Sequence, residues 1–212
     1  MLARKRSLNR VYHLLDIRNW ASVQAHGLLS TARLAQLSDN QAPHQLSIQR
    51  LVEERFSCGA YVRDQRPMPP RALMRCLTSG VRPEDWYRLL NSRVFFWIDA
   101  KRLSRQHLAC GDRDQMVLVI DAQRLLEVHA ERAAVSPINT GNALRAAAPR
   151  NLSTFVPYAS WVDDGWAHER IPHAAPRSAT HKPVELTVAE AVPDVCDYVI
   201  EVVSLKAGQA FA

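Results

Sequence analysis

Two short, unbroken apolar runs constrain the fold of this chain most strongly. Residues 94–98 read Val-Phe-Phe-Trp-Ile, and residues 116–120 read Met-Val-Leu-Val-Ile. Each run has the length of a strand, and apolar residues at every position are typical of a strand that is covered on both faces. The sequence therefore predicts a sheet whose central strands lie between two layers of packed side chains.

Short helices are predicted around these strands. Asn19 and Gly27 have the residue types that begin and end a helix, and Ser30 can cap a second one. Pro83, followed by two acidic residues, is typical of a helix start. The predicted helices cover residues 20–26, 31–37, 48–56 with Ser47 as its cap, 71–77, 83–91, 99–108 and 122–126. Further strands are expected in a short segment that begins at residue 11 and carries His13, near 128–130, at 182–188 and at 198–203. Residues 143–181 read as one long irregular segment.

Two polar loops carry candidate ligand-binding groups. Residues 57–70 contain Gly59 and three prolines, which exclude a regular helix, and they include Arg63 beside Asp64. A guanidinium group fits phosphate oxygens, although Arg63 could instead pair with Asp64 and only fix the loop. The turn around Asn139 offers backbone amides to a ligand, while the usual role of such a turn is geometric.

A resemblance gives these residues a common interpretation. Tyr12-His13, Asn19 and the block Gly27–Ser30 resemble the opening motif of DarT-like ADP-ribosyltransferases, in which it forms the floor of an NAD pocket. Leu15 stands where those proteins often carry threonine. The Arg63 loop resembles their cofactor-contacting segment.

The strand at residues 182–188 resembles the catalytic-glutamate strand of the same proteins. Its alternating pattern places Glu185 on the polar face, opposite to the core. The blocks Arg63–Met68 and Val94–Trp97 also resemble an uncharacterised bacterial family, as does the segment around Asn139. Without the resemblance, Glu185 would be a solvent-facing acid, and His13 and Asn19 would be a buried histidine and a helix cap.

The resemblance implies an α+β fold with a split, twisted, mostly antiparallel sheet and short surrounding helices. It implies a single domain over residues 1–212, with flexible ends at 1–8 and 207–212. NAD is the expected substrate, without a metal. Glu185 and Arg63 are the expected catalytic residues, and the expected cofactor-binding residues are His13, Asn19, Gly27, Arg63 and Asn139. Phe95 or Phe96 could stack on nicotinamide or belong to the core.

Other outcomes stay open at this point. The acceptor of ADP-ribose could be a protein, a nucleic acid or water, and the oligomeric state is open. The alternative to an enzyme is a non-catalytic nucleotide-binding or structural module of the same fold.

Composition limits the class of protein further. No apolar run approaches the roughly 18 residues of a membrane span, so we expect no membrane partner and a cytoplasmic location. Four widely spaced cysteines indicate neither a zinc site nor a disulfide framework. The net charge of +6 results from 27 basic and 21 acidic residues. This mild excess favours an anionic small molecule over a nucleic acid as the ligand.

Overall fold

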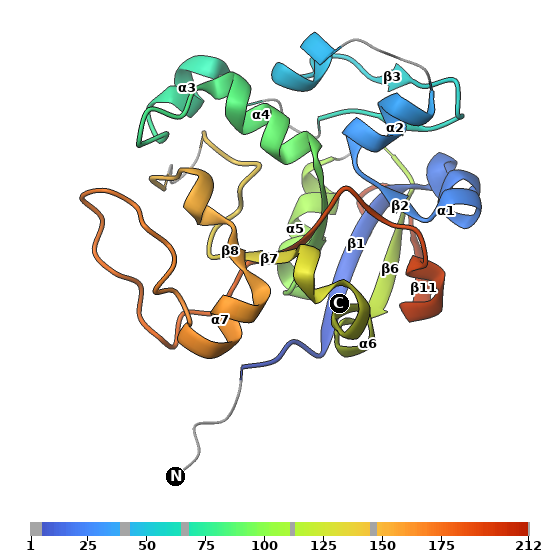
Figure 1. The fold of residues 1–212 in the computed structure, drawn as a ribbon. Coiled ribbons are helices and arrows are strands. Elements are labelled where there is room, and N and C mark those ends of the chain that lie inside the picture. The colour runs from blue at the N-terminus through green and yellow to red at the C-terminus, as the bar shows by residue number, and fades with distance from the viewer. Residues whose placement is uncertain (1–5, 39–42, 65–67, 111–112, 145–147, 212) are drawn as a thin grey trace.

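The chain folds around one seven-stranded antiparallel sheet with short helices on both of its faces (Figure 1). The structure is a computed structural model and describes residues 6–38, 43–64, 68–110, 113–144 and 148–211. The strand order is β11-β6-β1-β5-β9-β7-β8, and every pairing within this sheet is antiparallel. The expected α+β class with a mostly antiparallel sheet is therefore confirmed.

The elements of the first half of the chain include the first two strands of the large sheet. They are β1 (Arg10–Asp16), η1 (Ile17–Asn19), α1 (Trp20–His26), β2 (Leu28–Leu29), α2 (Thr31–Leu37), η2 (Pro43–Ser47), β3 (Glu54–Arg55), β4 (Tyr61–Val62), α3 (Pro70–Met74), α4 (Pro83–Asn91) and β5 (Arg93–Trp97), where η denotes a 3-10 helix.

The second half contributes the other five strands of the large sheet. Its elements are α5 (Ala100–Ala109), β6 (Gln115–Asp121), α6 (Ala122–His129), η3 (Ala130–Arg132), β7 (Ala133–Ser136), η4 (Leu152–Thr154), β8 (Val156–Pro157), α7 (Tyr158–Asp164), β9 (Glu185–Ala189), β10 (Ala191–Val192), η5 (Val195–Tyr198) and β11 (Val199–Leu205).

The two apolar runs form central strands, as predicted. β5 lies between β1 and β9, and β6 lies between β11 and β1. Val94 and Phe96 are buried, and all of residues 115–120 are buried as well. The helices predicted at residues 20–26, 31–37 and 83–91 are present with these bounds.

The two faces of the sheet have different cores. On one face, α1, α6 and α7 contribute to a large apolar cluster with Val11, Phe96, Leu118, Leu186 and Val188. On the other face there are two smaller clusters. One places Leu103 of α5 against Val117 and Val119, and the other joins α3 and α4 to Phe95 and Phe155.

Three predictions about local structure were wrong. Residues 48–53 do not form a helix, because the Ser47 hydroxyl donates to His44 O in the preceding turn instead of capping a following helix. No strand forms at residues 128–130, because α6 continues to His129, which is buried and bonded to Asp194. Residues 143–181 are not irregular throughout, since they contain η4, β8 and α7.

Parts of the two expected flexible ends make tertiary contacts. Leu8 is buried in the large cluster, and the ring of Phe211 lies edge-on against Tyr12. These contacts attach both segments to the sheet.

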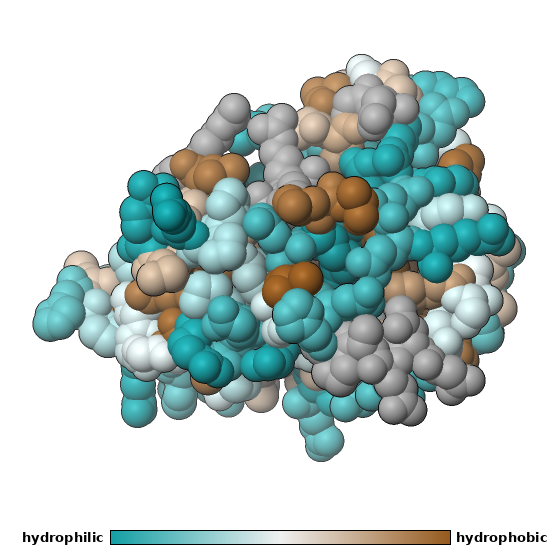
Figure 2. Space-filling model, turned by 90° about the horizontal axis from the view of Figure 1, so that it is seen from above, coloured by the Kyte–Doolittle hydropathy of each residue, from teal (hydrophilic) through white to brown (hydrophobic). Residues whose placement is uncertain are grey.

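The molecular surface carries apolar residues in small groups. Figure 2 shows separate hydrophobic groups among mostly hydrophilic residues on the face seen from above. Leu51 and Val52 are among the most exposed apolar side chains. None of the helices in the described ranges has both the length and the apolar composition that crossing a bilayer requires.

Candidate functional site

A cavity of about 780 Å³ lies between α4 and α5, next to β5 and β9. This volume falls within the range of small-molecule sites. Side chains from distant parts of the chain line it, including four of the six predicted site residues. These four are His13, Arg63, Asn139 and Glu185.

Glu185 is buried at the start of β9. It lies opposite Trp97 of β5 and Ser136 of β7, so it is between two strands and is only 5% exposed. The prediction that Glu185 lies on the polar face away from the core was therefore wrong in one respect. The side chains of β9 do alternate, but helices and the loop at residues 137–144 cover both faces of the strand.

Thr140 donates to both oxygens of the Glu185 carboxylate. Thr140 N lies 3.2 Å from Oε1 and 3.3 Å from Oε2, and the Thr140 hydroxyl lies 2.8 Å from Oε2. Burial raises the pKa of the Glu185 carboxyl to about 7, and these hydrogen bonds oppose the rise. Glu185 consequently changes its charge near neutral pH.

Arg150 holds the loop that carries Thr140. Its side chain is 1% exposed and donates to three backbone oxygens, those of Thr140, Asn142 and Ala148, at 2.8–3.1 Å. Trp86 Nε1 also donates to Thr140 O, at 3.4 Å. The orientation of Thr140 toward Glu185 therefore depends on a buried guanidinium group.

His13 occupies the place where two strands separate. The only register pair between β1 and β5 is Tyr12 with Trp97, and beyond it the imidazole Nδ1 lies 2.8 Å from Phe95 O. A carbonyl oxygen only accepts, so Nδ1 must carry the proton. Burial lowers the pKa of His13, which favours the neutral ring. Nε2 then remains as a hydrogen-bond acceptor.

The register of the strands separates His13 from Glu185. Glu185 is opposite Trp97, and Trp97 is opposite Tyr12, so Glu185 shares a sheet face with Tyr12. The side chain of His13, which follows Tyr12, leaves β1 on the opposite face of the sheet, because side chains alternate along a strand. The strands of His13 and Glu185 are not neighbours, since β5 lies between them. Both residues nevertheless line one cavity, at the point where the sheet opens.

Arg63 follows β4 and lines the cavity from another side. The alternative in which it pairs with Asp64 is not what the structure shows. Asp64 Oδ1 lies 2.6 Å from Arg50 Nη1, and Oδ2 accepts from Arg50 N at 2.7 Å. No described residue forms a hydrogen bond or ion pair with the Arg63 side chain.

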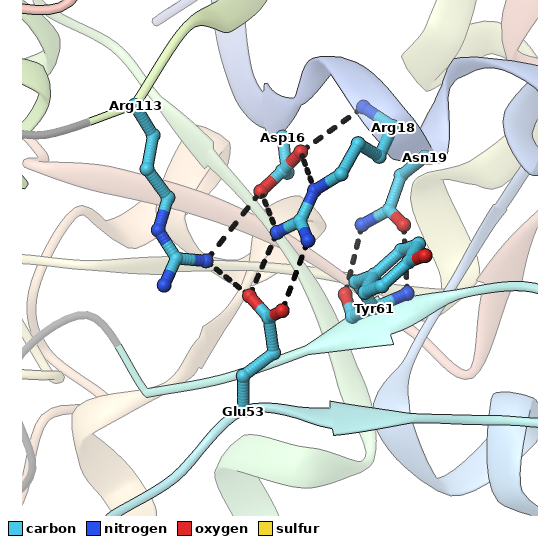
Figure 3. A network of polar contacts seen from close by, with 6 residues as sticks. All are labelled: Asp16, Arg18, Asn19, Glu53, Tyr61 and Arg113. Carbon is cyan, nitrogen blue, oxygen red and sulfur yellow. Dashed lines mark hydrogen bonds and ion pairs between the residues drawn. The ribbon is translucent and has the colours of Figure 1, made fainter.

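Asn19 has a structural role that the sequence did not reveal. Its side chain makes no cap bond, and it is not among the cavity-lining residues. Its amide instead donates to Tyr61 O at 2.9 Å and accepts from Tyr61 N at 2.8 Å (Figure 3). Asn19, in the 3-10 helix that follows β1, therefore attaches β4, the strand that precedes Arg63.

Ion pairs strengthen the same attachment. Arg18 bonds to Asp16 at 2.6 Å and to Glu53 at 2.7 Å, and Arg113 also pairs with Glu53 (Figure 3). The Arg18 guanidinium also lies 4.0 Å from the centroid of the Tyr61 ring. The network joins the end of β1 to the segments directly before β3 and before β6.

Gly27 is also structural and lies outside the cavity lining. It has a φ of 71°, and a Cβ there would lie 2.4 Å from Pro193 Cα. A side chain would therefore be strained by the backbone conformation and would also collide with the turn after β10.

Asn139 and the two phenylalanines have mixed roles. Asn139 Oδ1 accepts from Gly141 N at 3.0 Å, so this side chain shapes the turn as well as lining the cavity. Phe96 belongs to the large apolar core and is 1% exposed. Phe95 packs edge-on against Phe155 on the cavity side.

Arginine side chains dominate the charge of the cavity. Its lining contains Arg63, Arg93, Arg102 and Arg105 but only two acids, Asp64 and Glu185. Asp64 is already paired with Arg50, so the positive charge is not balanced. A concave site with this charge favours an anionic ligand.

Sequence reasoning missed several of these residues. In the sequence, Arg93 directly precedes the apolar run at residues 94–98, and Thr140 follows Asn139 in a polar turn. These positions, next to a predicted strand and in a predicted turn, are the only sequence signals that either residue belongs to the site. Nothing in the local sequence distinguishes Arg150 from the many other arginines.

A family model described as Family of unknown function (DUF7002) matches residues 9–199. This match covers most of the chain, so the protein belongs to that family. No curated protein matches the sequence.

Proposed function

We propose that this member of a family of unknown function binds NAD or a related dinucleotide and cleaves the bond between nicotinamide and ribose, as an ADP-ribosyltransferase does. One observation carries the proposal. His13, Arg63 and Glu185, which are far apart in the sequence, line the same cavity.

Each of the three side chains offers a different kind of interaction. Neutral His13 presents Nε2 as an acceptor for a ribose hydroxyl. Arg63 offers N–H donors that no described residue accepts from, and a guanidinium group binds phosphate oxygens in a bidentate manner. Glu185 offers a carboxylate in a largely desolvated position.

The proposed chemistry depends on the charge of Glu185. When the bond to nicotinamide breaks, positive charge develops on the ribose ring. A fixed carboxylate in a site that excludes water stabilises this charge more than it stabilises the ground state. Because the pKa of Glu185 is about 7, the ionised fraction and the rate should rise as the pH increases through neutrality.

A non-catalytic nucleotide-binding module is the alternative, and two observations favour it. Both oxygens of Glu185 already accept hydrogen bonds from Thr140. Leu15, at the position where related motifs often carry threonine, is buried in the apolar core and offers no hydroxyl group.

The test is nicotinamide release from labelled NAD by the wild type and by Glu185→Gln. Removing one preorganised stabilising group should slow release by about 10²- to 10³-fold. ADP-ribose should still bind both proteins, and a concentration of a hundred times Kd should stabilise each by about 2.7 kcal/mol. Glu201→Gln, at an exposed position of β11, is the matched control and should react like the wild type.

Two outcomes would contradict the proposed enzymatic activity. If Glu185→Gln releases nicotinamide as fast as the wild type, Glu185 has no catalytic role. If ADP-ribose stabilises the wild type but no nicotinamide is released with water, protein or nucleic acid as acceptor, the binding module replaces the enzyme.

A further inference from the structure

Arg93 is a cationic residue of the cavity without an acidic partner among the described residues. It begins β5, is half-buried and lines the cavity. Its Nε donates to the Thr187 hydroxyl at 2.8 Å, and its guanidinium lies 5.2 Å from the centroid of the Phe155 ring. These contacts fix the plane of the group but leave its charge uncompensated.

Most of the donors of Arg93 remain available. A guanidinium group carries five N–H donors, and the described contacts use only the one on Nε. The Thr187 hydroxyl donates in turn to Ala134 O at 3.2 Å, so the oxygen that receives Arg93 is itself fixed. The two terminal nitrogens are therefore held in place, and no described residue accepts a hydrogen bond from them.

Burial without a partner has a cost. Desolvation lowers the pKa of Arg93 to about 10, which shows how unfavourable the site is for an unpaired cation. Such a group destabilises the free protein, and a bound anion would remove this penalty.

Strand geometry places Arg93 near Glu185. Thr187 follows Glu185 by two residues on β9, so both side chains lie on the same face, about 7 Å apart along the strand. Arg93 reaches Thr187 from the paired strand. An anionic group bound to Arg93 would consequently lie on the Glu185 side of β9, in the cavity that both residues line.

We propose that Arg93 binds the phosphate adjacent to the ribose that Glu185 contacts, which makes it a substrate-binding residue of the cavity. The proposal rests on the proposed NAD-binding function. It assigns the nearer phosphate to Arg93 and leaves Arg63, on another side of the cavity, for the remainder of the pyrophosphate.

The test measures calorimetric binding of inorganic pyrophosphate and of ADP-ribose to the wild type, Arg93→Gln and Arg93→Lys. Arg93→Gln should lower the affinity for both ligands by about tenfold or more, since hydrogen bonds from a charged donor are lost. Arg93→Lys should recover only part of the affinity, because an ammonium group lacks the fork geometry. Arg124→Gln, at an exposed position of α6, removes the same charge outside the cavity and is the control.

Thermal unfolding without ligand supplies the second readout. Arg93→Gln should raise Tm, because it removes an uncompensated cation, whereas a structural role would make the same change destabilising. The proposal would be overturned if Arg93→Gln bound pyrophosphate and ADP-ribose as tightly as the wild type. It would also be overturned if Arg93→Gln had a lower Tm than the wild type while Arg93→Lys bound both ligands with wild-type affinity. Anion binding that depends on Arg93 without nicotinamide release would contradict only the enzymatic function.

Discussion

The two faces of β9 show how one strand serves two purposes. Leu186 and Val188 point into the large apolar cluster, where α6 and α7 also contribute side chains. Glu185 and Thr187 point to the cavity side, where their partners are Thr140 and Arg93. All four side chains are buried. The apolar side can gain stability from simple burial, whereas the polar side needs a specific partner for every group.

The difference between the faces has a thermodynamic meaning. Removing methylene groups from a packed core always costs free energy. Removing a buried charge can instead stabilise the protein while it damages a ligand site. The faces of β9 should therefore respond to substitution with opposite signs.

The largest effect is expected on the apolar face. Leu186→Ala should lower the free energy of unfolding by about 2–5 kcal/mol, because Leu186 is fully buried and its neighbours fill the cavity only partly. Urea denaturation measures this change. The affinity of the folded protein for ADP-ribose should stay within about twofold of the wild type, since no ligand donor is removed.

Val202→Ala is the control for this prediction. Val202 lies on the edge strand β11 and is 42% exposed, so its truncation should cost far less. Equal losses in the two variants would show that the burial of Leu186 does not determine its contribution.

A smaller effect of opposite sign is expected for Glu185→Gln. The carboxyl ionises near pH 4.5 in the unfolded chain and near 7 in the folded protein. Between these values the folded state binds more protons, so wild-type stability falls as the pH rises. The variant should gain stability relative to the wild type from about pH 4.5 to 7, by at most about 3 kcal/mol, and the difference should be constant above this range.

Urea denaturation at a series of pH values measures this difference, with Glu201→Gln as the control. This control removes a carboxylate from an exposed position of β11, and its stability should follow that of the wild type. A stability difference between wild type and Glu185→Gln that does not vary between pH 4.5 and 7 would mean that Glu185 is ionised as easily in the folded as in the unfolded chain.

The smallest effect concerns the partner of Glu185. Thr140→Val keeps the shape of the side chain but removes the hydroxyl that donates to Oε2, which stabilises the ionised form. The pKa of Glu185 should rise above 7 by roughly one unit, since a bond to a charged group contributes about 1–3 kcal/mol. Carboxyl titration by NMR of glutamate-labelled protein measures the shift.

Thr180→Val changes an exposed threonine away from Glu185 and should leave that titration unchanged. If Glu185 titrates identically in Thr140→Val and in the wild type, the Thr140 hydroxyl does not stabilise the carboxylate. The backbone amide of Thr140 would then be the group that does.

Local sequence determined the elements whose signals lie within a few residues. The runs at 94–98 and 116–120 became central strands because apolar side chains at successive positions can be satisfied only by burial on both faces. Ser30 accepts from Arg33 N, and Gly27 adopts a positive φ, as their residue types predicted. The last two outcomes depend only on a hydrogen bond and a backbone angle at the end of one helix.

Tertiary structure decided what the polar residues do. Local pattern does not reveal that the Asn19 amide bonds to Tyr61 rather than capping a helix. Nor does it reveal that Asp64 pairs with Arg50, which leaves Arg63 without a partner among the described residues. Glu185 looked like a surface acid because its strand alternates, yet a loop fixed by Arg150 covers it. The partner that a polar side chain finds 14 to 45 residues away depends on how strands and loops pack, and local pattern carries no information about that packing.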